Sequence, residues 1–168
     1  PRCLASCSAA RPPPRREGGV LARLRSRPTA VAWRGLQSAG EGFYTIGSSD
    51  HESNAVVALG LRPTDPALLH YRSVAFYLSR ALQAGHADGV DDVLDGVASS
   101  VHDQISGGRH KVIGSKDLAI VPQTSTIGSH LPRAVGLAYA LGAADAGHQL
   151  PWPTDSVVVT SFGDASAN

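Results

Sequence analysis

The sequence has no methionine, few aromatic residues and almost no cysteine. Aromatic side chains make up 5% of the 168 residues, so a core must be filled by small apolar residues and backbone contact. Both cysteines, Cys3 and Cys7, lie at the amino terminus, which excludes a disulfide framework or a cysteine-ligated zinc site for the rest. No run approaches the roughly 20 apolar residues that span a bilayer. With 42% apolar residues, the sequence predicts one globular domain, or a large part of one, with no membrane partner.

Positive and negative charge are separated along the chain. Residues 1–40 hold eight arginines and one acid, Glu17, whereas residues 41–168 hold seven basic residues and thirteen acids. The acidic body argues against nucleic acid as a partner. Residues 1–30 are rich in arginine and proline and poor in large apolar residues, so we expect a disordered arm there and the folded domain over 31–168. The arm lacks the apolar core of a secretory signal, so we expect a cytoplasmic protein of bacterial type, with the mitochondrion as the alternative location.

Apolar spacing predicts helices that alternate with short strands. Apolar residues recur at helical intervals over 73–84 and 90–101, and Ser49 and Glu52 have the spacing of a capping box before another helix. The run 157–162 (Val-Val-Val-Thr-Ser-Phe) is typical of a parallel strand buried on both faces. This alternation predicts an α/β fold with a doubly wound, mostly parallel sheet flanked by helices.

In such sheets, ligands bind beyond the carboxyl ends of the strands, and three segments there can carry chemistry. Gly163 lets a ligand approach the backbone, and Asp164 offers a hard oxygen to magnesium near a helix N-terminus; alternatively, Asp164 only caps that helix. Tyr71 and Arg72 suit a phosphate, or else a surface arginine stands beside a core tyrosine. The polar loop 123–132 exposes amides and carbonyls to a ligand ring, or serves as an extended helix cap.

These segments and two more occur in one order along the chain. The series reads Phe43-Tyr44-Thr45-Ile46-Gly47 with His51-Glu52, Thr64-Asp65 before Tyr71-Arg72, Ser125-Thr126-Ile127-Gly128-Ser129-His130-Leu131-Pro132-Arg133-Ala134-Val135-Gly136, and Gly163-Asp164. It resembles the alpha component of thiamine-diphosphate-dependent 2-oxo acid dehydrogenases, the first enzyme of the pyruvate and branched-chain complexes. The likeness covers roughly residues 30–168. It implies the thiamine-diphosphate-binding fold, which we expect to be truncated here because the sequence stops within the last motif.

The resemblance also implies which residues bind the cofactor. They come from three segments: Tyr71, Arg72, Ser125, Ile127, Gly163, Asp164 and Ala165. In the family, the Tyr-Arg pair holds the diphosphate, the serine and the isoleucine backbone line the aminopyrimidine, and the aspartate coordinates the magnesium that bridges the diphosphate. Ala165 stands where the family commonly has glycine, and it still permits close approach.

A potassium site is a further possibility that the resemblance raises. Thr124, Ser129 and His130 match positions at which some relatives bind potassium. His130 replaces an amide residue there, which argues against the ion.

The activity implied is oxidative decarboxylation of a 2-oxo acid, with transfer of the acyl group to a lipoyl group on an acyltransferase core. In the family, the glutamate that activates the aminopyrimidine comes from a beta component, in a separate or fused chain. We therefore assign no catalytic residue to this chain and expect it to be inactive alone. Two alternatives stay open: a transketolase-like thiamine enzyme, and a non-catalytic truncated fragment.

Overall fold

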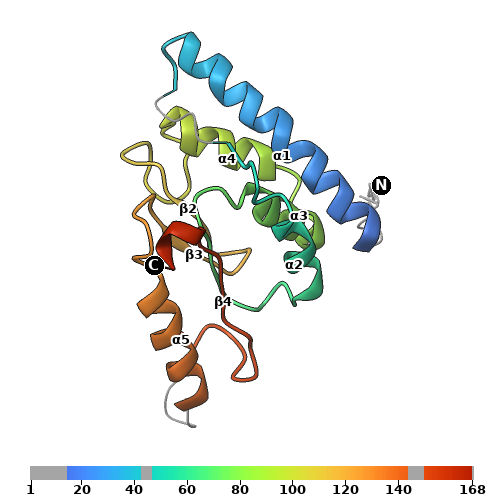
Figure 1. The fold of residues 1–168 in the computed structure, drawn as a ribbon, viewed down its shortest axis with the longest axis vertical. Coiled ribbons are helices and arrows are strands. Elements are labelled where there is room, and N and C mark those ends of the chain that lie inside the picture. The colour runs from blue at the N-terminus through green and yellow to red at the C-terminus, as the bar shows by residue number, and fades with distance from the viewer. Residues whose placement is uncertain (1–14, 43–46, 144–149, 168) are drawn as a thin grey trace, which may run out of the picture.

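The computed structural model describes residues 15–42, 47–143 and 150–167 (Figure 1). Five helices and four short strands make up this part of the chain. The helices are α1 (Arg15–Ser38), α2 (Asn54–Gly60), α3 (Val74–Ala84), α4 (Gly89–Ala98) and α5 (Leu131–Ala143), and the strands are β1 (Ala67–Leu68), β2 (Ile113–Ser115), β3 (Ile120–Gln123) and β4 (Val159–Thr160). A single 3-10 turn, η1 (Asp164–Ser166), follows β4. Within these ranges, no helix combines the length and apolar character needed to cross a membrane.

The strands form one mixed sheet in the order β2-β3-β1-β4. Strand β1 pairs in parallel with β3 on one side and with β4 on the other, and β2 adds to β3 as an antiparallel edge strand. Ala67 of the central strand β1 lies opposite Ile120 of β3 on one side and Val159 of β4 on the other. The predicted α/β class with a mostly parallel sheet and flanking helices is confirmed at this level.

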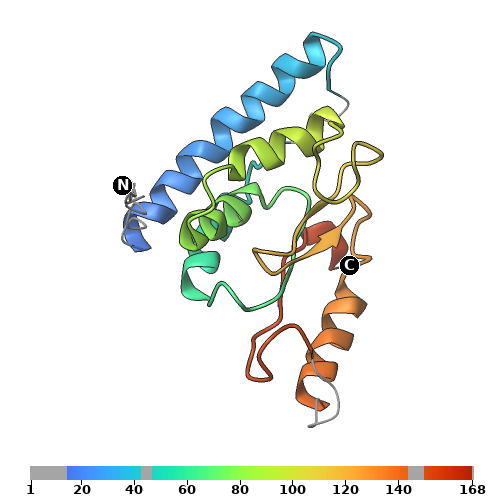
Figure 2. The same ribbon diagram turned by 180° about the vertical axis from the view of Figure 1, so that it is seen from behind.

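The direction of the chain changes at β1, and this positions the site. The connection from β1 to β3 runs through α3 and α4, whereas the connection from β3 returns through α5 to β4 on the other side of β1. Crossovers between parallel strands are almost always right-handed, so these two connections favour opposite faces of the sheet. In both views, α5 lies apart from α1–α4 (Figures 1 and 2). The carboxyl ends of β1, β3 and β4 meet at one edge, where doubly wound sheets bind ligands.

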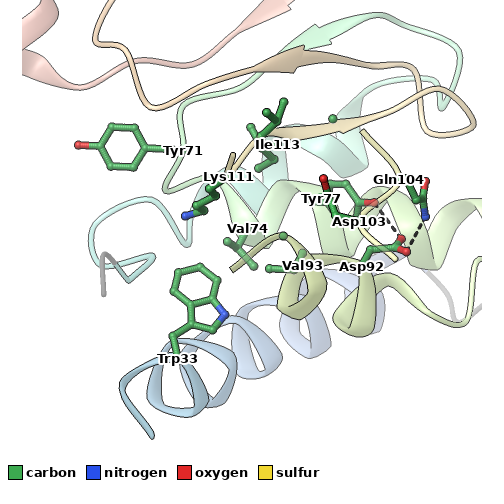
Figure 3. A pocket seen from close by; sticks show the side chains of 13 residues that line it. Trp33, Tyr71, Val74, Tyr77, Asp92, Val93, Asp103, Gln104, Lys111 and Ile113 are labelled. Carbon is green, nitrogen blue, oxygen red and sulfur yellow. Dashed lines mark hydrogen bonds between the residues drawn. The ribbon is translucent and has the colours of Figure 1, made fainter. Parts of the chain in front are cut away.

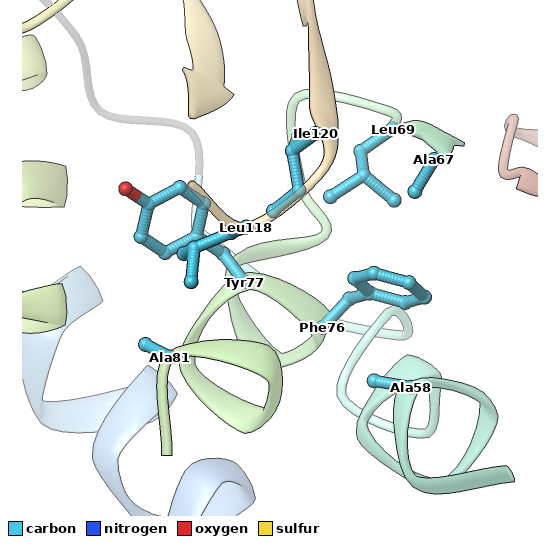
Figure 4. Close-up of a cluster of buried hydrophobic side chains, with 8 residues drawn as sticks. All are labelled: Ala58, Ala67, Leu69, Phe76, Tyr77, Ala81, Leu118 and Ile120. Carbon is cyan, nitrogen blue, oxygen red and sulfur yellow. The ribbon is translucent and has the colours of Figure 1, made fainter. Parts of the chain in front are cut away.

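Helix α3 carries the main core. Phe76, Tyr77 and Ala81 pack against buried residues of the sheet and of α2 (Figure 4); these partners are Ala58, Ala67, Leu69, Leu118 and Ile120. The wholly buried Arg80 donates from Nη1 to the carbonyl oxygens of Asp65 (2.6 Å) and Leu118 (3.2 Å). This one side chain ties α3 to the segments that lead into β1 and β3.

Residues 15–30 correct the expectation of a disordered arm over 1–30, because they belong to α1. Ala22, Ser26 and Ala30 are spaced four apart, are buried, and let α1 lie close to the rest of the molecule. Trp33 adds a large anchor with no exposed surface. The abundance of arginine and proline in residues 1–30 indicated disorder over positions that the structure places in a helix. Residues 1–14 of the arm, and Phe43 to Ile46 of the first motif, lie outside the described residues.

Two local expectations were wrong. Helix α2 begins at Asn54 after Ser53, and no side chain caps it, so Ser49 and Glu52 do not form a capping box. Glu52 instead accepts a hydrogen bond from the Arg27 guanidinium (3.3 Å), which joins this loop to α1. Strand β4 spans only two residues at the edge of the sheet and is half-buried, whereas the run 157–162 predicted a strand buried on both faces.

Candidate functional site

The loops after β1, β3 and β4 surround one open cavity at the carboxyl edge of the sheet. It encloses about 1050 Å³ of empty space, counted with the part open to solvent. Six of the seven residues predicted to bind the cofactor line it: Tyr71, Arg72, Ile127, Gly163, Asp164 and Ala165. They come from positions up to 94 apart in the sequence, as counted from Tyr71 to Ala165 (165 − 71). The parallel sheet therefore brings these motifs together around one space.

The seventh predicted residue, Ser125, is not among the lining residues. Its Oγ is buried, and none of the described residues gives it a hydrogen-bond partner. The neighbouring polar side chains are engaged within their own loop: Ser129 Oγ donates to the Thr126 carbonyl (3.1 Å), and Thr124 Oγ1 donates to Thr126 Oγ1 (3.1 Å). The described residues contain no cluster of three histidine, cysteine or acidic side chains arranged for a metal ion.

Arg72 and Tyr71 follow β1 directly. The Arg72 guanidinium lies 5.8 Å from the centre of the Tyr71 ring, and its Nη1 donates to the Gly47 carbonyl at 3.5 Å. The Arg72 backbone N–H donates to Nδ1 of His70 at 3.3 Å, which shapes the turn after the strand. Because both side chains are half-buried at the cavity wall, a planar cationic fork and a phenol hydroxyl are presented to a ligand there.

Two histidines that the sequence analysis did not assign to the site also line the cavity. The rings of His51 and His70 stack with centres 4.6 Å apart and planes 9° from parallel. Burial, with His51 and Arg72 nearby, lowers the pKa of His70 to about 4, so this ring is neutral at neutral pH. Burial and Arg72 also lower the pKa of His51, against the opposing charges of Asp50 and Glu52. The sequence held two signals for them: His51 belongs to the first motif of the series, and His70 directly precedes the Tyr-Arg pair.

Gly163 and Asp164 form the opposite wall, after β4. A Cβ on Gly163 would lie 3.7 Å from Nε2 of His70, so the missing side chain leaves this space to the cavity. Asp164 is exposed, and its Oδ1 accepts the Ala165 backbone N–H at 2.9 Å. The expected helix N-terminus is only the three-residue turn η1, so an anion here gains little from a helix dipole. Asp50, exposed and with φ of 70°, is the second carboxylate on the cavity wall.

A smaller pocket adjoins the cavity and shares Tyr71 with it (Figure 3). Its walls are mainly apolar, with Val74, Val93 and Ile113 among them, and the Lys111 ammonium lies 4.7 Å from the centre of the Trp33 ring. Burial, together with a smaller repulsion from the positive charge of Arg72, lowers the pKa of Lys111 to about 8. Composition gave no signal for this pocket, because it forms only where α1, α4 and β2 meet around α3.

Neither a scan of protein-family models nor a search of curated proteins returned a match to this chain. A functional assignment therefore depends on whether the cavity suits the group that the motifs imply. Its donor set does suit a magnesium diphosphate: Arg72 and Tyr71 are donors for phosphate oxygens, and Asp164 offers a hard oxygen. Magnesium in such sites typically takes one or two carboxylates and completes its shell with phosphate oxygens and water.

Proposed function

We propose that this chain forms the diphosphate- and magnesium-binding side of a thiamine-diphosphate-dependent 2-oxo acid dehydrogenase, as its alpha component. The observation that carries the proposal is the meeting of three separate motifs at one cavity. Tyr71 with Arg72, Ile127, and Gly163 with Asp164 each follow a different parallel strand and line the same space. The topology brings the ends of the parallel strands to the edge at which doubly wound sheets bind ligands, and the side chains found there include an arginine, a tyrosine and a carboxylate, which suit a metal-bound diphosphate.

Each of these residues has a task that its chemistry suits. The Arg72 guanidinium pairs with diphosphate oxygens through two parallel N–H groups, and the Tyr71 hydroxyl adds a neutral donor. The Asp164 carboxylate coordinates magnesium, and the bare backbone at Gly163 lets the phosphates approach. Ile127 lines the cavity, where its backbone can contact the aminopyrimidine ring of the cofactor.

The bound cofactor supplies an electron sink for the decarboxylation of a 2-oxo acid. The chain's own residues bind and orient it. The proposal assigns the base-activating glutamate to a beta component, in a separate or fused chain, and acceptance of the acyl group to a lipoyl acyltransferase core. An assignment of the remaining groups to partner chains agrees with the openness of the cavity, which the described residues cover only in part.

Binding of the cofactor to the purified chain tests the proposal. Thiamine diphosphate is titrated into isotope-labelled protein with and without magnesium, and the backbone N–H signals are followed by NMR, which detects weak binding. We expect magnesium-dependent shifts that concentrate at Arg72, Ile127 and 163–165. Asp164→Asn abolishes the magnesium dependence, because it replaces the proposed metal ligand with a neutral amide.

The matched control is Asp117→Asn, which removes the same charge from an exposed position outside the cavity. We expect this variant to bind like the unchanged protein. If the wild-type signals of the three loops do not move at millimolar cofactor with magnesium, or move equally in Asp164→Asn, the proposed function is wrong.

A further inference from the structure

The loop before α2 brings an imidazole to the cavity that the proposed cofactor site does not yet use. His51 lies on the cavity wall with Arg72 and Asp164, and it stacks face to face on His70. His70 is held by its own hydrogen bonds: its backbone N–H donates to Ser161 Oγ (2.9 Å), and its Nδ1 accepts the Arg72 backbone N–H. The stack therefore gives His51 a fixed platform beside the anion-binding residues.

Nδ1 of His51 is the last member of a chain of hydrogen-bonding groups, and this chain can adapt to either protonation state of the ring. Asn54 Nδ2 lies 3.5 Å from His51 Nδ1 and donates to Ser73 Oγ at 3.0 Å. Ser73 Oγ in turn lies 2.9 Å from Ser161 Oγ, and either hydroxyl can donate. When His51 is neutral, Nδ1 accepts from the Asn54 amide. When it is protonated, the Asn54 amide can turn its oxygen to the ring, and the two hydroxyls reverse direction.

The charged groups around His51 come from three loops, and a bound anion would change their balance. Its own loop contributes Asp50 and Glu52, the loop after β1 contributes Arg72 and the neutral His70, and the loop after β4 contributes Asp164. Glu52 is already paired with Arg27 of α1. Of the residues that line the cavity, Arg72 is the one permanent cation, whereas a diphosphate brings several negative charges. A negative ligand at this wall favours the charged form of a neighbouring imidazole.

We propose that His51 is a second protein cation for the diphosphate group, so that the anion binds together with a proton. This inference rests on the proposed cofactor site and adds a residue and a pH dependence to it. The neutral ring already offers an N–H donor at Nε2 when Nδ1 accepts from Asn54. Protonation of the ring adds a positive charge to that contact. A bound anion therefore raises the pKa of His51, and by the same linkage the anion binds more tightly at lower pH.

The test uses two probes, thiamine diphosphate with magnesium and inorganic diphosphate with magnesium. The ring signals of His51 are followed by NMR across a pH series, with and without each probe. We expect the titration midpoint of His51 to move upward when either probe is bound, and affinity to increase about tenfold from about pH 8 to about pH 5.5, the range in which histidine changes charge. His51→Gln keeps a donor but cannot be charged, so its affinity should gain much less at low pH than that of the unchanged protein, and the rest of the pH dependence comes from the phosphate's own ionisation at about pH 6.

His102→Gln is the matched control, since His102 is exposed and lies outside the cavity. It should keep the full pH dependence of the unchanged protein. If the probes shift the signals of Arg72 and Asp164 while the midpoint of His51 stays in place and His51→Gln keeps the pH dependence, this inference is overturned and the cofactor site stands. If neither probe shifts any signal of the cavity, both the site and the inference are overturned.

Discussion

Replacement of Trp33 by alanine measures how much α1 contributes to the fold. Trp33 has no exposed surface and belongs to a core cluster in which Ala22, Ala55, Val74 and Val97 are also fully or almost fully buried. Two of these neighbours are alanines, which cannot expand into the space left by an indole. Truncation of a buried tryptophan typically costs about 3–5 kcal/mol, and small domains are stable by only about 5–15 kcal/mol. We therefore expect Trp33→Ala to remove about a fifth or more of the free energy of unfolding.

Urea unfolding monitored by far-ultraviolet circular dichroism gives this free energy directly, and the melting temperature should fall by roughly 6–20 °C. Val31→Ala is the matched control, because Val31 lies on the same helix and its side chain is 62% exposed. It should change stability by less than about 0.5 kcal/mol. A loss below about 1 kcal/mol in Trp33→Ala would refute the assignment of α1 to the core and restore the view of the segment as an appended arm.

Two further predictions concern buried polar groups near the sheet. Asp65 is 2% exposed, and its carboxylate accepts the backbone N–H groups of Arg62 (2.8 Å) and Val157 (3.0 Å), so Asp65→Asn should lose about 1.5–3 kcal/mol in urea unfolding. No loss relative to Asp117→Asn would contradict this. His70, whose pKa burial lowers from 6.5 to about 4, binds its proton more readily in the unfolded chain, so the unfolding free energy should fall as pH falls from about 6.5 to about 4. His70→Asn should flatten that part of the stability profile, and an unchanged slope would show that His70 is not the group responsible.

Helices with large apolar residues at regular intervals could be predicted from the sequence. The run 73–84 became α3 (Val74–Ala84), because its apolar face is wide and its neighbours on the sheet are equally apolar. The amino-terminal half of α1 was assigned to a disordered arm, because arginine and proline dominate the composition of residues 1–30. Strand β4 was found but its burial was overestimated, since the pattern of one strand does not reveal whether a further strand pairs with it.

The candidate site was predictable to the extent that it depends on strand ends. Tyr71, Arg72 and Asp164 each follow a parallel strand, and topology alone brings such positions to one edge. His51 belongs to no strand end. It reaches the cavity because the loop before α2 folds against His70, a contact 19 positions apart in sequence (70 − 51) that no local pattern encodes. The same holds for Lys111, whose contact with Trp33 depends on how α1 packs.

The two walls of the cavity differ in local stability, and this difference affects how the cavity binds a ligand. Arg72 follows β1, which is buried, paired on both edges and tied to α3 through Arg80. Asp164 follows β4, which is half-buried and paired with β1 alone in the described sheet. Local stability in a protein follows burial and hydrogen bonding, so the Asp164 wall opens at lower free energy than the Arg72 wall. In the proposed function, a metal-bound diphosphate would join the two walls and contribute its binding free energy mainly to the weaker one. If the proposed cofactor site is right, cofactor affinity and the order of β4 are thermodynamically coupled, so that stabilising β4 should also tighten cofactor binding.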